Sequence, residues 1–451
     1  MSLSAIENGS LVYRLDFSDP DNLGKNTAGT SLPDAVFFGN VESDKRGDNS
    51  AVSLRSAGTR KNYISVPSAA LDYDEVTIAG WFRIDGDLPN YSRLISVNGG
   101  SKYLEIMPSH SGHYDGWCIN AGYEFPKSVR YENGWSNMPG LYGQLAVYDV
   151  WVNYAFTLTK DSFKAYQNGK LLWEEKGDFS PKRFCSEDGN IFLGATLFDA
   201  TPDISADYSD FRIYSKALTG EEITDSFSIT WRDMLTAEYD FENGAKDNVR
   251  GYKGSYIGNA KTASAYESPD KVLVLDGTLK NGKKTSLELN PKTFVGHHEM
   301  TLSFDLYVSS STGAYSRIIE INGLNNGARR LTIASNWAGS FNFAVQYTNN
   351  NDKPELEQLS TFSPVYDKWV KYAFVLDGKT VRVYADGVLV HEAKCDWTDD
   401  IFYDGAHFTK AMISIGRTQY WGDDPLTGAM DDLRVYSCAL TEKEILEEAG
   451  I

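Results

Sequence analysis

The sequence predicts an all-β protein made of two antiparallel β-sandwiches. Three observations predict this fold class: a motif that occurs twice, short alternating strands separated by turn residues, and a scarcity of helical segments. The motif Asp210–Ile223, DFRIYSKALTGEEI, recurs as Asp432–Ile445, DLRVYSCALTEKEI. One copy closes each half of the 451-residue chain. We therefore expect two copies of one fold in tandem, at residues 1–227 and 228–451.

The repeated motif is typical of a strand followed by a turn and a short helix. Its first five positions alternate polar and apolar residues, a pattern that buries one face of a strand. Thr219 followed three residues later by Glu222 forms a capping box, a common helix start. Thr441 and Glu444 repeat these roles in the second copy. The motif therefore predicts the same closing strand and capped helix in both halves.

The other expected elements also occur in pairs. The matched segments are 11–17 with 235–241, 76–84 with 300–308, 91–99 with 315–323, 151–172 with 369–390, and 191–194 with 413–416. The longest pair predicts two hairpins in each half, because Asn168-Gly169 and Asp386-Gly387 are dipeptides favoured in tight hairpin turns. Strands separated by turns every 8–12 residues or so, with helices of only a single turn, favour an antiparallel sandwich.

The charge of the chain excludes some classes of ligand. The formal net charge is −19. Residues 1–228 hold 20 Lys and Arg against 31 Asp and Glu, and residues 229–451 hold 23 against 31. Phosphate binding needs a basic face, so we expect no nucleic-acid partner and no polyanionic glycan. Neutral glycans and divalent cations at local sites remain open.

The cysteines and the apolar pattern bear on the cellular compartment. The four cysteines fall at unmatched positions in the two halves and include no Cys-x-x-Cys pair, which argues against a disulfide framework or zinc site. No run of 18 apolar residues occurs, so we expect no membrane-spanning helix. The N-terminus, MSLSAIENG, lacks the features of a signal peptide, and its Met-Ser-Leu start indicates that a native leader was trimmed.

Both halves resemble the laminin-G-like, concanavalin A-like jelly-roll family. The residues that carry the resemblance are Trp151–Leu171, Leu193-Gly194 and Asp210–Ile223 in the first half, and Trp369–Leu389, Ile415-Gly416 and Asp431–Ile445 in the second. The resemblance implies a jelly roll of two curved antiparallel sheets in each half. It also implies a secreted, periplasmic or cell-surface protein, with glycans bound on the concave sheet or the loops at its rim.

The resemblance further implies a structural calcium ion near the first strand and the Asp-Asp strand. The residues it marks as ligands are Asp431, Asp240 and Asp16. Ser209 matches Asp431 in the first half, which favours the second half as the calcium site. Because Asp431 and Asp432 are adjacent on a strand, we expect their side chains to face opposite sides. The alternative is that these acids are solvated loop residues.

Candidate sugar contacts follow from the chemistry of glycan sites, which set flat aromatic faces against sugar rings and use Asn, Asp, Gln or Arg to bind the hydroxyls. The candidates are Trp117, Asn120, Tyr123 and Trp135 in the first half, and Asn336, Trp337, Tyr420 and Trp421 in the second. The first-half candidates lie in Met107–Val150, an aromatic-rich segment that we expect to be an insertion. The alternative for each residue is packing of a long loop onto its own sheet.

A catalytic site is not predicted. Related glycosidases need two carboxylates roughly 5–10 Å apart on one strand face. Segment 76–84 contains no acid, and segment 300–308 contains Asp305 alone. We therefore predict a non-catalytic carbohydrate-binding or adhesion protein. The alternatives are a glycoside hydrolase with an atypical carboxylate pair, and a structural module that binds a partner protein in a surface complex.

Overall fold

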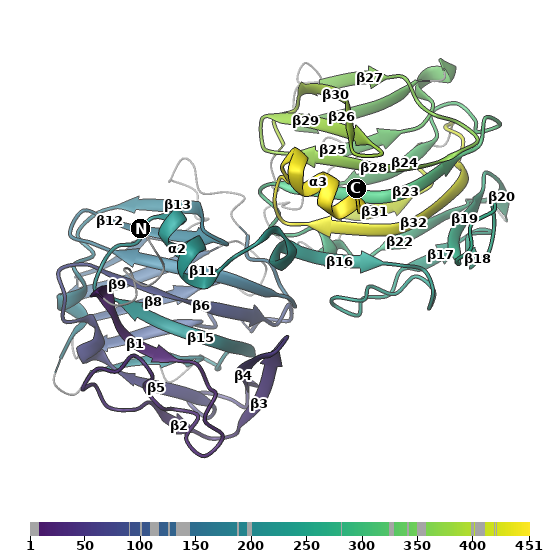
Figure 1. The fold of residues 1–451 in the computed structure, drawn as a ribbon. Helices are drawn as coiled ribbons and strands as arrows, with labels where there is room; N and C mark the ends of the chain where they lie inside the picture. Colours follow the sequence, from purple (N-terminus) through teal and green to yellow (C-terminus); the bar gives the residue numbers. More distant parts are fainter. Residues whose placement is uncertain are drawn as a thin grey trace. The chain divides into compact units, whose positions relative to one another are not determined.

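A computed structural model describes the protein (Figure 1). The residues it describes are 9–89, 91–99, 102–108, 117–124, 127–131, 145–186, 189–195, 201–280, 282–323, 329–340, 342–349, 358–397, 401, 411–418, 420 and 422–451. The chain divides into two compact units, Met1–Asp233 and Met234–Ile451. The predicted boundary lies after residue 227. Each unit is a sandwich of two antiparallel sheets with its own core.

In the first unit, a short helix, α2 (Gly220–Phe227), packs on one sheet, which we call the helix-side sheet. Its strand order is β13 (Lys170–Lys176), β12 (Ser162–Gln167), β11 (Trp151–Leu158), β6 (Val76–Ile84), β15 (Ala206–Tyr214), β4 (Asn49–Leu54) and β3 (Val41–Arg46), and β1 (Leu11–Leu15) also pairs with β15. We call the other the opposite sheet, with the order β10 (Lys127–Tyr131), β9 (Cys118–Glu124), β8 (Lys102–Met107), β7 (Ile95–Gly99), β14 (Asn190–Leu193), β5 (Tyr63–Pro67) and β2 (Val36–Phe38).

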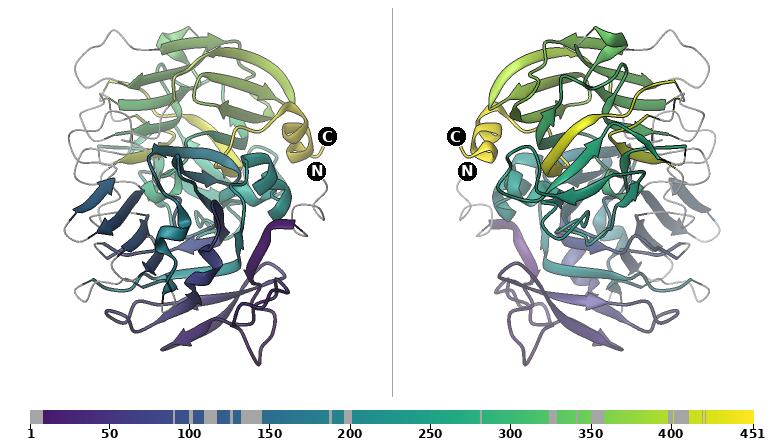
Figure 2. Two further views of the ribbon diagram at one scale, coloured as in Figure 1. Left: turned by 90° about the vertical axis from the view of Figure 1, so that its left-hand side faces the viewer. Right: turned by 90° about the vertical axis from the view of Figure 1, so that its right-hand side faces the viewer.

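The second unit repeats the strand order of both sheets. Figures 1 and 2 show its strands layered as two sheets. Its helix-side sheet, which carries helix α3 (Glu442–Ala449), has the order β30 (Val388–Lys394), β29 (Thr380–Ala385), β28 (Trp369–Leu376), β23 (Met300–Val308), β32 (Thr427–Tyr436), β19 (Val272–Asp276) and β18 (Lys261–Ala263), and β16 (Leu235–Tyr239) pairs with β32. Its opposite sheet has the order β27 (Gln358–Phe362), β26 (Phe343–Asn349), β25 (Arg329–Ala334), β24 (Arg317–Asn322), β31 (Met412–Ile415), β22 (Ser286–Leu289) and β17 (Ser255–Ile257).

The remaining elements are small. A hairpin joins β20 (Leu279–Lys280) to β21 (Lys283–Lys284). Short 3-10 turns lie at Ser68–Leu71, Pro181–Phe184, Trp231–Met234, Pro291–Thr293 and Trp337–Gly339. No helix in the described part of the chain has the length and apolar character needed to cross a membrane.

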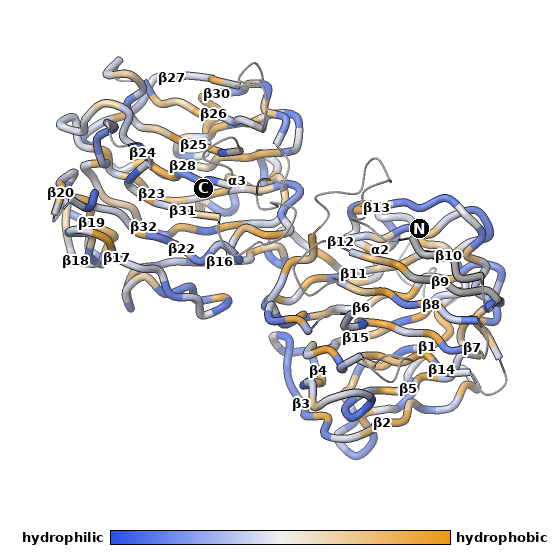
Figure 3. The backbone as a smooth tube through the Cα atoms, turned by 180° about the vertical axis from the view of Figure 1, so that it is seen from behind, coloured by the Kyte–Doolittle hydropathy of each residue, from blue (hydrophilic) through white to orange (hydrophobic). Residues whose placement is uncertain are grey.

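The core of each unit lies between its two sheets, and strand alternation places it there. In the opposite sheet of the second unit, the core-facing residues are Leu287, Ile319, Ile321, Leu331, Ile333, Val345, Ile413 and Ile415, all buried. The residues between them point away from the core, because successive side chains on a strand face opposite sides. Figure 3 shows hydrophobic and hydrophilic positions interleaved along the strands.

The repeated motif folds as the sequence predicts. Thr219 and Thr441 each cap a helix, and the glutamate three residues later closes a capping box in both units. The prediction of single-turn helices is wrong, since each helix has eight residues. In α2 the reason is packing: Ile223 and Phe227, one turn apart, are both buried.

The hairpin prediction is confirmed. Asn168 and Gly169 have φ of 49° and 77°, and Asp386 and Gly387 have φ of 47° and 77°. Positive φ at both central residues is the geometry of a type I′ turn, whose twist matches that of the flanking strands.

The prediction that Met107–Val150 is an insertion is wrong for part of that segment. It contains β9 and β10, which complete the opposite sheet where β26 and β27 do in the second unit. Two of the residues paired in this hairpin are glycine and alanine, so the alternation of polar and apolar residues is weak there. The sequence pattern therefore did not reveal these strands.

Candidate functional site

The outward side of the opposite sheet in the second unit carries a row of polar side chains. The row crosses five neighbouring strands and consists of Glu288, Ser414, Glu320, Thr332 and Gln346, each standing beside the next in the ladder. All of these except Glu288 are buried, although they face away from the core. We call this row, with the side chains that flank it, the polar face.

Several groups on the polar face are buried without a partner. The hydroxyls of Ser414 and Thr332 and both amide atoms of Asn322 have no hydrogen-bond partner among the residues that the structure describes. Leaving a buried polar group unsatisfied costs about 1–3 kcal/mol. Such groups usually contact ordered water, so we expect water molecules between the side chains of this face.

Arg330 lies over the polar face and links it to an exposed aromatic ring. Its Nη2 donates to Gln346 Oε1 at 3.1 Å, and its Nη1 donates to the Tyr420 hydroxyl. The guanidinium carbon also lies 5.1 Å from the centroid of the Tyr420 ring. Tyr420 is 40% exposed, so its ring borders both the arginine and solvent.

Arg317 holds the other flank. Its Nη2 donates to Asp423 Oδ2 at 2.9 Å, and its Nε lies 3.5 Å from Glu320 Oε2. The guanidinium lies 5.5 Å from the centroid of Trp337, a distance suited to a cation–π contact. Burial lowers the pKa of Arg317, and the acids Glu320 and Asp423 oppose that shift.

Two of the four second-half candidates, Tyr420 and Trp337, fall at this face. Tyr420 and Trp337 contact its two arginines, as described above. Asn336 is buried, and its Nδ2 donates to the carbonyl of Thr312 at 3.4 Å, so it supports the chain at the start of the 3-10 turn. Trp421 lies outside the described residues.

The first-half candidates are placed differently. Trp117 is 1% exposed and packs edge-on against Tyr154 and Phe156, with ring centroids 4.7 and 5.5 Å away. Its ring offers no free face to a sugar, so Trp117 is not part of the site that we consider. The backbone of Asn120 pairs with Glu105 on the neighbouring strand. The side chains of Asn120 and Tyr123, and all of Trp135, lie outside the described residues.

Sequence reasoning missed the arginines and the polar row. One signal was present: Tyr-Ser-Arg occurs at 91–93 and again at 315–317, with the arginine at the same place in both repeats. Glu320 lies in a segment that the sequence predicted as a strand, but only the structure shows that its outward side chain is buried.

A pocket of about 420 Å³ opens beside the β22 end of the polar face. We call it the rim pocket. Its lining is Ile257, Gly282, Lys283, Lys284, Glu288, Arg417 and Thr418. Glu288 belongs to both the pocket and the polar row, so the two surfaces are continuous.

A second pocket, of about 410 Å³, lies on the helix-side sheet of the same unit, and we call it the acidic pocket. Its lining includes Trp369, Lys371 and the acids Glu267, Asp270, Asp305, Asp386, Asp431 and Asp432. Asp305 and Asp431 are cross-strand neighbours on β23 and β32. Burial raises the pKa of Asp431 to about 7, and the nearby charges of Asp432 and Asp305 add to the shift.

The prediction that Asp431 and Asp432 face opposite sides is wrong, since both line the acidic pocket. The register of the β23–β32 ladder shifts between Ser303 and Asp305, where Asp432 has a φ of 48°. This left-handed residue forms a bulge that interrupts strand alternation. Asp210 has a φ of 49° at the matching bulge of the first unit.

Comparison with protein families identifies both units. The family model described as the concanavalin A-like lectin/glucanases superfamily matches residues 57–224 and 281–446. The chain belongs to this superfamily. Its units are therefore two concanavalin A-like, laminin-G-like domains. No curated protein sequence matches the chain.

Solved structures give distant matches. Domain 4 of the extracellular GH43 arabinanase AbnA from Geobacillus stearothermophilus, in complex with arabinotriose, is 20% identical, with 48% of this chain and 98% of that chain covered and a TM-score of 0.37. A botulinum neurotoxin type C structure, whose description ties cell entry to two ganglioside molecules, is 14% identical, with 99% and 97% covered and a TM-score of 0.41. The CBM40 of a Ruminococcus gnavus sialidase, bound to α2,3 sialyllactose, is 14% identical, with 34% and 83% covered and a TM-score of 0.27. Similarities this low say nothing about the ligand of this chain.

The two concanavalin A-like domains keep one ion pair by different means. In the first domain, Arg93 donates from Nε and Nη2 to the two oxygens of Glu105, at 3.0 and 3.1 Å. Glu105 stands opposite Ser96 in the ladder, whereas in the second domain Glu320 stands opposite Thr332. The acid beside the arginine is therefore on the neighbouring strand in one domain and on the arginine's own strand in the other.

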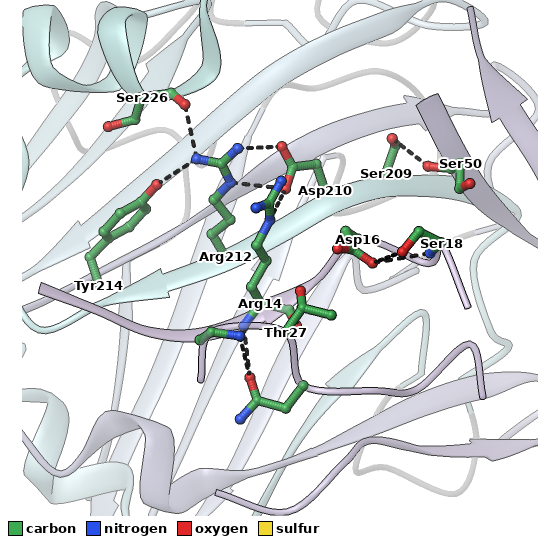
Figure 4. Close-up of polar contacts among 12 residues, drawn as sticks. Arg14, Asp16, Ser18, Thr27, Ser50, Ser209, Asp210, Arg212, Tyr214 and Ser226 are labelled. Carbon is green, nitrogen blue, oxygen red and sulfur yellow. Dashed lines mark hydrogen bonds and ion pairs between the residues drawn. The ribbon is translucent and has the colours of Figure 1, made fainter. Parts of the chain in front are cut away.

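The calcium ligands implied by the superfamily can be tested against the geometry. In the first domain, Asp16 accepts from the backbone N and Oγ of Ser18 at 3.0 and 2.8 Å (Figure 4). Asp210 accepts from Arg14 Nε at 2.8 Å and from Arg212 Nε and Nη2 at 2.9 and 2.6 Å (Figure 4). Ser209 donates to the Ser50 carbonyl at 2.8 Å. The neighbouring acid Asp210 is thus neutralised by arginines.

In the second domain, Asp240 accepts from the backbone N of Glu242 at 3.1 Å and from Asn248 Nδ2 at 2.8 Å. Calcium takes six to eight oxygen ligands. Among the described residues, no group of three or more His, Cys, Asp or Glu is placed to hold a metal ion. Asp16, Asp240 and Asp431 therefore do not form a calcium site by themselves, and calcium binding stays a prediction.

Proposed function

We propose that this protein is a non-catalytic glycan-binding protein and that the polar face of its second domain is the binding surface. The observation that carries the proposal is the 40% exposed ring of Tyr420, which lies beside the Arg330 guanidinium at the edge of this face. A guanidinium donates to sugar hydroxyls, and the Tyr420 hydroxyl can donate or accept. The exposed ring of Tyr420 at the edge of the face offers an apolar surface to the C–H face of a sugar ring.

The finer parts of the proposal follow from that surface. A protein of this kind would act in adhesion to polysaccharide at or beyond the cell surface. The first domain shares the fold and the arginine–glutamate pair but carries Tyr103 where the second domain has Arg330, since each pairs with the matching asparagine, Asn98 or Asn322. We therefore assign glycan binding to the second domain.

A glycan-array screen of the full chain, with and without CaCl₂, tests the proposal. We expect binding to at least one glycan, and Tyr420→Ala weakens it about tenfold, the equivalent of ~1.4 kcal/mol at a binding hot spot. Tyr73→Ala is the matched control, because Tyr73 is a 36% exposed tyrosine in the first domain. Absence of binding to every glycan would contradict the proposal.

Glycoside hydrolysis is a second candidate function, favoured by one observation. Asp431, whose pKa burial raises to about 7, stands beside Asp305 in the acidic pocket, and burial raises the pKa of Asp305 as well. Such a pairing suits the general acid and the nucleophile or base of a glycosidase. Release of reducing sugar from a polysaccharide panel, lost in Asp431→Asn and in Asp305→Asn, would establish this function. Binding without such release leaves the non-catalytic proposal standing.

A further inference from the structure

The rim pocket concentrates positive charge in a domain that is otherwise acidic. Among the described residues that line it, Lys283, Lys284 and Arg417 stand against one carboxylate, that of Glu288. Residues 229–451 as a whole hold 23 Lys and Arg against 31 Asp and Glu. A concave site lined by one sign of charge raises the local concentration of ligands of the opposite sign.

Lys284 fixes the wall between the rim pocket and the polar face. It is buried, and its Nζ donates to the backbone carbonyls of Tyr420 and Asp423. Burial lowers its pKa, and the charges of Arg317 and Arg417 lower it further, whereas Asp423 and Asp424 oppose the shift. The lysine therefore holds in place the segment that carries Tyr420.

Arg417 supplies donors that face the pocket. Its Nη2 donates to Glu288 Oε1 and lies 3.4 Å from the sulfur of Met412, so the side chain folds back over β31. Its Nε is buried and has no hydrogen-bond partner among the described residues. A guanidinium has five N–H donors, so the contact with Glu288 leaves donors for a second acceptor.

Lys283 completes the positive lining. It is exposed, and it forms no ion pair within the part of the chain that the structure describes. A flexible, exposed ammonium beside an anchored guanidinium suits a small anion, since the guanidinium gives direction and the ammonium adds charge.

We infer that the rim pocket binds the carboxylate of an acidic sugar, a hexuronic or sialic acid, within a glycan held on the polar face. The inference rests on the proposed function. A volume of about 420 Å³ lies toward the small end of the range for ligand pockets. The net charge of −19 repels a long polyanion, so the pocket suits one carboxylate in a largely neutral chain.

The first domain lacks this arrangement, which makes it an internal control. Ile64 pairs with Leu193 as Leu287 pairs with Ile415, so the two ladders can be aligned. Arg60 and Lys61 then match Lys283 and Lys284, but Ser65 stands in place of Glu288 and Ala195 in place of the guanidinium of Arg417. Carboxylate recognition should therefore belong to the second domain alone.

The test compares matched ligands on the full chain by isothermal titration calorimetry. The ligands are oligosaccharides ending in glucuronate, galacturonate or N-acetylneuraminate, each beside its carboxyl-reduced neutral form. We expect the acidic form to bind about tenfold more tightly. Lys283→Gln and Arg417→Gln should each remove most of that preference and leave the neutral form unchanged. Glu288→Gln should strengthen binding of the acidic form severalfold, because it removes the competing carboxylate.

Arg60→Gln, which removes the charge that matches Lys283 in the first domain, should change nothing. Lys283 is exposed, so its variant keeps the fold and the test remains decisive even where Arg417→Gln unfolds. Equal binding of acidic and neutral forms, or competition by inorganic phosphate as strong as by the acidic sugar, overturns the inference and leaves the proposed function standing. Absence of binding by either form of every oligosaccharide overturns both.

Discussion

Asp210 shows how one residue can hold a bulge in place. Its left-handed backbone is tolerated because aspartate enters this region more readily than most residues. Its carboxylate is held by Arg14 and Arg212, and the Arg212 side chain is only 6% exposed. The matching Asp432 is held by a weaker ion pair. Its side chain is 37% exposed, and its partner Arg434 also pairs with Glu238 and Glu448.

We expect Asp210→Ala to destabilise the first domain by about 3 kcal/mol, because it leaves a buried guanidinium without its main partner. Asp432→Ala should cost less, about 1 kcal/mol, since Arg434 keeps two other carboxylates. Urea unfolding of both variants measures the difference. Equal losses would show that the ion pairs do not set the stability of the bulge.

Asp431 should make the second domain less stable as pH rises. Its pKa is raised from 3.8 to about 7, so between these values the folded state binds the proton more tightly than the unfolded state. Stability from this group is therefore present below pH 4 and is lost as pH rises toward 7. Asp431→Asn mimics the protonated form and should raise the melting temperature by about 2–4 °C at pH 8.

At pH 5 the same substitution should stabilise the domain less than at pH 8, because only part of the pH range between 3.8 and 7 has been crossed. Ser209→Ala, at the matching position of the first domain, should act equally at both pH values. Differential scanning fluorimetry at pH 5 and pH 8 provides the comparison. A larger stabilisation at pH 5 than at pH 8 would refute the assigned pKa direction.

At the scale of elements, the β12–β13 hairpin meets helix α2 at Gly169. A Cβ there would lie 2.0 Å from Thr224 Oγ1 and 2.9 Å from the Gly220 carbonyl oxygen. Gly29 has nearly the same φ, 76° against 77°, but no atom within 4 Å of its Cβ position. Alanine substitutions at Gly169 and Gly29 therefore separate the free-energy cost of a left-handed backbone from the cost of a steric clash.

We expect Gly169→Ala to destabilise by about 3 kcal/mol, from left-handed strain of about 1 kcal/mol plus the overpacking against α2. Gly29→Ala should lose only the strain, about 1 kcal/mol. Chemical denaturation of both variants checks this. Similar losses would mean that the helix moves aside freely.

The sequence predicted well those elements in which the pattern of apolar residues and the turn residues indicate the same strand. Strands β6 and β23 have the predicted bounds because every second residue along them must enter the core. The bulges at Asp210 and Asp432 were missed, because the alternation of the repeated motif starts at these residues and does not show the shift of register before them. Trp117 was predicted as a sugar contact because its residue type cannot distinguish a buried aromatic from an exposed one.

At the scale of the molecule, each compact unit has its own pair of sheets and its own core, so we expect the domains to fold independently. Residues 234–451 expressed alone should unfold cooperatively and bind the same glycans as the full chain. Residues 1–233 should fold but not bind. Circular dichroism melts and calorimetry of the two pieces check both statements, and glycan binding confined to the first piece would contradict the assignment to the second domain.

The candidate site could be predicted only in part, because it is assembled from distant segments. Tyr420 and Trp337 were named from the sequence, whereas Arg330, Gln346 and Arg417 were not. Lys284 and Arg417 lie far apart in the chain and meet only because β22 pairs with β31. The positive charge of the rim pocket could not be predicted from the acidic net charge, because a net charge does not say where in the fold the charged residues lie.

The glutamate that changes strands between the domains constrains how they diverged. If both domains descend from one duplicated sequence, two substitutions separate their arrangements. One arrangement is Ser96 opposite Glu105, and the other is Glu320 opposite Thr332. An ancestor that changed one position first carried either two carboxylates beside the arginine or none. The first intermediate crowds like charges in a buried site, and the second removes a carboxylate from beside a buried cation, so each is disfavoured. Once both positions have changed, a return to the earlier arrangement must pass through one of these two intermediates. The position of the glutamate is therefore hard to reverse, and the two domains keep different residues at this pair.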